Sequence, residues 1–125
     1  MEKRILVFVI LTFFALSGCG NAGEVDTLLS NAKRDGRMVM LELGSVGCTT
    51  CEQMKPAMEK LKTHYEGKME VIFVDVRKDR ESARRFRVTM IPTQVFLDKT
   101  GKEFHRHMGY YPYEEIVPVL EKAGL

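Results

Sequence analysis

Two apolar runs on either side of a pair of cysteines constrain the fold more than any other feature of the sequence. Residues 38–43 and 71–76 are apolar apart from one acidic residue in each, Glu42 and Asp75. Runs of this kind are typical of strands that are covered on both faces of a parallel sheet. Between them, apolar residues recur on one face of a predicted amphipathic helix, at Met54, Ala57, Met58, Leu61 and Tyr65. The strand-helix-strand order predicts an α/β fold.

The other segments extend this pattern over the rest of the chain. The sequence predicts helices at about residues 25–34, 49–66, 80–86 and 112–123, and strands at about residues 38–43, 71–76, 93–97 and 102–108. Pro118 should kink or delay the last helix. The order α-β-α-β-α-β-β-α predicts a central mixed β-sheet that is flanked by helices on both faces.

The composition suits one globular domain. Of the 125 residues, 45% are hydrophobic and 29% are charged, and no internal repeat or linker divides the chain. The formal net charge is only +2, and the basic residues form no block. We therefore expect no nucleic-acid partner.

The N-terminal residues have the layout of an export signal. Lys3 and Arg4 precede an apolar run at residues 5–16 that only Thr12 interrupts, and small residues follow it. The run is too short to cross a bilayer, which requires about 20 apolar residues. We therefore expect residues 1–18 to be a signal peptide.

Leu16-Ser17-Gly18-Cys19 resembles the lipobox of bacterial lipoproteins, in which a peptidase cuts before a lipid-modified cysteine. The resemblance implies a lipid on Cys19, a short tether at residues 19–23 and a folded domain at residues 24–125. The protein would then be extracytoplasmic and anchored by lipid to a bacterial membrane. An ordinary export signal that is cleaved after Ala22 is the alternative.

Cys48 and Cys51 lie where the first predicted strand is followed by a helix. The free N–H groups and the positive end of the dipole at a helix N-terminus stabilise a thiolate. Cys48, the first and more exposed residue, would act as the nucleophile, and Cys51 would resolve the mixed disulfide. The same spacing also occurs in half of a metal site or in a structural disulfide. Export favours the redox interpretation, because a dithiol in an oxidising compartment stays reduced only through an active relay.

A proline far beyond the cysteines narrows these alternatives. Ile91-Pro92-Thr93 directly precedes a predicted strand, and Pro56 follows the cysteines in their helix. The combined order resembles the thioredoxin superfamily, and within it the exported thioredoxin-like thiol-disulfide oxidoreductases. The resemblance implies a thioredoxin fold in which Pro92 takes the place of the family's cis-proline. The residues that it implies for substrate binding are Ile91, Pro92, Thr93 and Gly109.

Glu42 stands before Cys48 where thioredoxins keep a buried aspartate that helps to deprotonate the second cysteine. A carboxylate within an apolar strand is costly without a purpose, so the resemblance implies that Glu42 relays a proton for Cys51. An exposed glutamate near the end of a strand is the alternative. The position of the lysine that partners this acid in the family falls on Val71. Thr49-Thr50 replaces the Gly-Pro that the family often has between its cysteines.

These features predict a membrane-anchored extracytoplasmic enzyme that reduces protein disulfides through Cys48 and Cys51. Its partners would be protein thiols and disulfides and a membrane thiol electron carrier, since the chain has no dinucleotide-binding fingerprint. We expect a monomer without a cofactor. A copper or zinc metallochaperone that uses the same cysteines is the alternative. At Glu103, His105 and His107, which share a strand face, we expect a solvated edge and no metal site.

Overall fold

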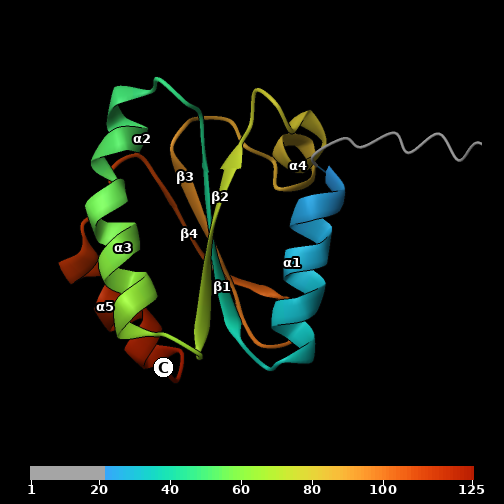
Figure 1. Cartoon of the computed structure of the whole chain (residues 1–125). Helices are drawn as coiled ribbons and strands as arrows, with labels where there is room; N and C mark the ends of the chain where they lie inside the picture. The colour runs from blue at the N-terminus through green and yellow to red at the C-terminus, as the bar shows by residue number, and fades with distance from the viewer. Residues whose placement is uncertain (1–21) are drawn as a thin grey trace, which may run out of the picture.

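Four strands form the middle of three layers in the computed structural model, which describes residues 22–125 (Figure 1). The strands are β1 (Met38–Gly44), β2 (Met69–Asp75), β3 (Thr93–Leu97) and β4 (Glu103–Met108). Their order in the sheet is β2-β1-β3-β4. β1 runs parallel to β2, whereas β3 runs antiparallel to both β1 and β4. The predicted mixed sheet is therefore confirmed.

Helices cover both faces of this sheet. One face carries α1 (Ala22–Arg34) and α4 (Arg80–Arg85), and the other carries α2 (Thr49–Gln53), α3 (Lys55–His64) and α5 (Tyr113–Lys122) (Figure 1). Each face has its own buried apolar cluster. The cluster under α3 and α5 includes Met40, Leu61, Phe96, Ile116 and Leu120. The cluster under α1 and α4 includes Val25, Leu41, Ile72, Phe86 and Val95.

β1 is a central strand, and all of its residues are buried. Side chains alternate between the two faces of a strand. Val39, Leu41 and Leu43 accordingly belong to the cluster under α1 and α4, whereas Met40 belongs to the cluster under α3 and α5. Glu42 is two residues from Met40, so its carboxyl group lies on the face that α2 and α3 cover.

The helix that the sequence predicts over residues 49–66 is divided into α2 and α3. Pro56 lies in the first turn of α3, and its nitrogen has no hydrogen to continue the helical bonding pattern. The backbone N–H of Met54 ends α2 by donating to the Cys51 carbonyl oxygen at 3.1 Å. The cysteine pair is therefore carried by a short helix of its own. α5 begins at Tyr113 and continues past Pro118.

α1 begins at Ala22, so residues 22 and 23 of the predicted tether are helical. The predicted signal peptide and the predicted lipid on Cys19 lie outside the described residues. Between residues 22 and 125, no helix has both the length and the apolar character that a membrane span requires.

Candidate active site

Cys48 and Cys51 form a disulfide at the start of α2, with 5.2 Å between their Cα atoms. Cys48 is the N-cap residue of α2, and its sulfur accepts a hydrogen bond from the Cys51 N–H at 3.3 Å. Cys48 is half-buried, whereas Cys51 is only 4% exposed. An incoming sulfur therefore reaches Cys48 first, and the N-terminus of α2 stabilises its thiolate once the disulfide is reduced.

The loop between β1 and α2 brings Cys48 to this position. Gly47 has a φ angle of +82°, in the left-handed region that favours glycine. The Cys48 N–H donates to the Ser45 carbonyl oxygen at 3.3 Å and closes the turn. A glycine before the first cysteine thus fits the backbone conformation of this loop.

Gly44, at the end of β1, is a site residue that none of the sequence motifs reveals. A Cβ atom at this position would lie 2.9 Å from the Cys51 sulfur and 3.2 Å from the Cys51 Cβ. The sulfur of Cys51 therefore packs directly on the backbone of β1. The available signal was a glycine at the end of an apolar strand, which often marks the close approach of another group.

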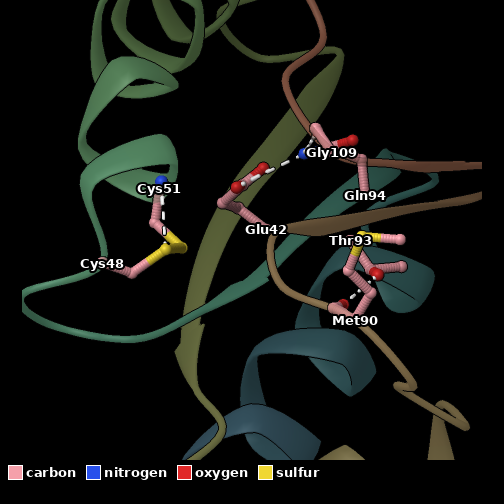
Figure 2. Close-up of a disulfide and its surroundings, with 7 residues drawn as sticks. All are labelled: Glu42, Cys48, Cys51, Met90, Thr93, Gln94 and Gly109. Atoms are coloured by element: carbon pink, nitrogen blue, oxygen red, sulfur yellow. Dashed lines mark hydrogen bonds between the residues drawn. A yellow bond between two sulfur atoms is a disulfide. The ribbon is translucent and has the colours of Figure 1, made fainter.

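Glu42 lies two residues before Gly44 on the same face of β1, about 7 Å along the strand. Its side chain is fully buried, so the alternative of an exposed carboxylate is wrong. Oε1 accepts a hydrogen bond from Gln94 Nε2 at 3.4 Å, whereas Oε2 finds no partner among residues 22–125 (Figure 2). Burial raises the pKa of Glu42 to about 7, and the hydrogen bond from Gln94 opposes this increase. A carboxyl group with such a pKa can both accept and release a proton near neutral pH.

The neighbour of Glu42 on β2 is Phe73. The parallel register places Phe73 opposite Glu42 and Val71 opposite Met40. The prediction that Val71 occupies the place of the lysine beside the acid is therefore wrong by two residues. Phe73 offers the carboxyl group neither a positive charge nor a hydrogen bond, which leaves burial as the dominant influence on its pKa.

The predicted substrate-binding residues come together at the adjoining ends of β3 and β4. The peptide bond between Ile91 and Pro92 is cis. The Gly109 N–H donates to the Pro92 carbonyl oxygen at 2.8 Å, and Thr93 Oγ1 donates to the Met90 carbonyl oxygen at 2.6 Å. The first bond connects the cis-proline loop to the end of β4, and the second closes the cis-proline loop on itself. That these residues bind substrate remains a prediction.

Large apolar side chains are exposed in the loop before Cys48, beside the cis-proline and around Gly109. Val46 precedes the cysteine pair and is 64% exposed, and Met90, beside the cis-proline, is 51% exposed. Met108 and Tyr110, on either side of Gly109, are also about half exposed. Exposed apolar groups gathered around a site are typical of a surface that contacts another protein.

The two histidines of β4 are less exposed than the sequence predicts for a solvated edge. His105 and His107 are half-buried, because both pack against the buried Tyr111. His105 Nε2 lies 3.1 Å from the Tyr111 hydroxyl oxygen, and burial lowers the pKa of His105. Among residues 22–125, no group of three or more His, Cys, Asp or Glu side chains is arranged to hold a metal ion.

The fold and the disulfide together define a class of protein. A mixed sheet of this order, with a cysteine pair at the N-terminus of the helix after its central strand and a cis-proline before the next antiparallel strand, is the thioredoxin fold of thiol-disulfide oxidoreductases. Residues 25–124 match the family described as Thioredoxin-like domain, and the chain belongs to this family.

Known thioredoxins resemble the chain over most of its length. A thioredoxin of Staphylococcus aureus is 27% identical over 92 residues, which cover 74% of this chain and 88% of that protein. The structure of Fasciola hepatica thioredoxin has a TM-score of 0.70 at 27% identity and covers 81% of this chain and 92% of its own. A poplar thioredoxin h has a TM-score of 0.72, covering 86% of this chain and 95% of its own, and its 22% identity supports the fold alone.

Proposed function

We propose that the protein is a membrane-anchored, extracytoplasmic reductase of protein disulfides. The observation that carries this proposal is the asymmetry of the cysteine pair. Cys48 is accessible at the start of α2, whereas Cys51 is buried against Gly44, with the carboxyl group of Glu42 on the same face of β1. The two sulfurs can therefore take the two successive steps of disulfide exchange.

In the first step, the Cys48 thiolate attacks one sulfur of a substrate disulfide. A bond forms between Cys48 Sγ and this sulfur, the substrate disulfide breaks, and its second sulfur leaves as a thiolate that takes a proton from solvent. In the second step, the Cys51 thiol transfers its proton to the Glu42 carboxylate, and its sulfur attacks Cys48 Sγ. The first substrate sulfur then leaves as a thiolate and takes a proton from solvent, and Glu42 releases its proton to solvent. Two electrons have passed to the substrate, and the Cys48–Cys51 disulfide remains.

Two features support reduction of substrates over their oxidation. Ile91 before the cis-proline resembles the reducing thioredoxins, and Thr49 and Thr50 add no charge that would strongly stabilise the Cys48 thiolate. Equilibration of the protein with glutathione tests the direction. A reduction potential at or below about −200 mV supports the proposal, whereas a value near about −120 mV, at the oxidising end of the family, contradicts it.

Reduction of insulin by dithiothreitol tests the activity. We expect Cys48→Ser to abolish catalysis and Cys51→Ser to accumulate mixed disulfides on Cys48, because resolution is lost. Cys19→Ser makes the same change at a cysteine outside the pair and should leave catalysis by the purified protein unchanged. Equal activity of the wild type and Cys48→Ser would refute the proposal. Stoichiometric, tight binding of copper by the reduced cysteine pair would favour the metallochaperone alternative.

The proposed anchor would keep the site near a membrane. Two residues, Gly20 and Asn21, separate Cys19 from the start of α1. The first turn of α1 and helix α2, which carries the disulfide, lie toward the same end of the molecule (Figure 1). A membrane thiol electron carrier is therefore the donor that we propose, since the tether would raise the local concentration for this encounter.

Release from the membrane tests the location and the donor together. We expect Cys19→Ala to move the protein into the soluble fraction and to leave Cys48 more oxidised in cells, while the purified protein keeps its activity. A protein that stays in the membrane fraction after this substitution would contradict the lipid anchor. An unchanged redox state after release would show that a soluble donor suffices.

A further inference from the structure

Gln94 is a fully buried amide at the second position of β3, and it has no role in the mechanism described above. Its neighbours in β3 include Val95 and Phe96, which belong to the apolar clusters. A polar group in such a place is costly unless it is hydrogen-bonded. Gln94 lies opposite Glu42 of β1 on one side and opposite His107 of β4 on the other.

The amide nitrogen of Gln94 connects the buried acid to Gly109, the residue that follows β4. It donates to Glu42 Oε1 at 3.4 Å and to the Gly109 carbonyl oxygen at 3.1 Å (Figure 2). A backbone carbonyl can only accept, so this contact fixes the amide with its nitrogen toward both partners. Gly109 in turn donates to Pro92, which completes a chain of contacts from the acid to the cis-proline.

The surroundings of Glu42 make this contact significant. Phe73 of β2 lies opposite the acid, and α2 places the Cys51 sulfur against Gly44, two residues further along β1. The other titratable group on this row of the sheet is His107, one strand beyond Gln94. Gln94 is therefore the one hydrogen-bond donor that the structure gives to Glu42 among residues 22–125. Its bond favours the ionised carboxylate, the form that can accept a proton.

We propose that Gln94 is a positioning residue for the second step of disulfide exchange. Its amide holds the carboxylate of Glu42 toward Cys51 and takes the place of a cationic partner for the acid. The inference rests on the proposed function, because it requires that Glu42 accept the Cys51 proton. Gln94 would thereby also couple the acid to the backbone of Gly109, one of the residues predicted to bind substrate.

Stopped-flow reaction of the reduced protein with dithionitrobenzoate, a chromogenic disulfide, separates the two steps. Attack by Cys48 releases the first nitrothiobenzoate, and attack by Cys51 on the mixed disulfide releases the second. We expect Gln94→Met to slow the second release at pH 7 about tenfold or more, the size expected for the loss of one hydrogen bond to a carboxylate. The midpoint of its pH profile should move upward, while the first release stays unchanged.

Gln53→Met is the matched control, because Gln53 is exposed on α2 and the same atoms are replaced there. It should leave both releases unchanged. Gln94→Glu is a second variant that keeps size and polarity. It places two carboxyl groups side by side, which resist ionising together, so the midpoint of the second release should rise further than in Gln94→Met.

A double-mutant cycle decides whether Gln94 acts through Glu42. In the Glu42→Gln background, Gln94→Met should have no additional effect on the second release. An equal slowing in both backgrounds would assign Gln94 a purely structural role and overturn the inference. If Glu42→Gln slows the second release but Gln94→Met does not, the inference fails while the proton role of Glu42 stands. If Glu42→Gln has no effect, the proposed mechanism itself is wrong.

Discussion

Replacing Glu42 with glutamine should flatten the pH dependence of the free energy of unfolding. The carboxyl group is fully buried, and burial raises its pKa from 4.5 to about 7. Between these two values the folded protein keeps a proton that the unfolded chain has already lost. The contribution of the protonated Glu42 to the free energy of unfolding is therefore complete below about pH 4.5, and it is lost as the pH rises through about 7.

The magnitude follows from the difference between the two pKa values. Each pH unit over which the folded protein holds one extra proton corresponds to about 1.4 kcal/mol. Integrated from pH 5 to pH 8, the wild type should lose about 2.5 kcal/mol of stability through this group. Glutamine has nearly the same shape and cannot ionise, so Glu42→Gln should lose this contribution to the pH dependence. The change is large beside a total stability of about 5–15 kcal/mol for typical proteins.

Urea unfolding of the oxidised protein at a series of pH values measures this effect, because the disulfide keeps the cysteines from titrating. Glu66→Gln is the matched control, since Glu66 is exposed and the same chemical change is made there. The control should follow the wild-type profile. Parallel profiles for the wild type and Glu42→Gln would refute the assignment of a raised pKa to this buried acid.

Two other substitutions test the packing, and a third tests an ion pair. Gly44→Ala should cost about 1–3 kcal/mol by urea unfolding, because its Cβ would meet the Cys51 sulfur at 2.9 Å, whereas Gly23→Ala, with open space around it, should not destabilise. Phe96→Ala removes a fully buried ring and should cost about 3–5 kcal/mol in the same assay. The hydrogen bond from Arg106 lowers the pKa of Glu103, so their stabilisation exists at neutral pH and is lost as the pH falls below the usual carboxyl range. Arg106→Leu should therefore cost up to about 1 kcal/mol at pH 7 and less at pH 3.

The sequence alone determined the order of the helices and strands and the position of the cysteine pair at a helix start. These features depend on local patterns, because a period of two or of 3.6 residues places side chains on one face without reference to distant segments. The face of β1 that carries Glu42 could be predicted for the same reason. The resemblance to thioredoxins added the expectation that the acid is buried, and the structure confirms it.

The tertiary structure decided which groups surround the acid. Phe73, and not Val71, stands opposite Glu42 because of the parallel register between β1 and β2. Gln94 reaches Glu42 because the antiparallel register of β1 and β3 brings together residues that are 52 positions apart. The contact between Gly44 and the Cys51 sulfur likewise depends on how α2 sits on the end of the sheet. Register depends on how the buried pattern of each strand meets that of its neighbour, and helix placement depends on the packing of both clusters. The pattern of one segment alone therefore does not determine them.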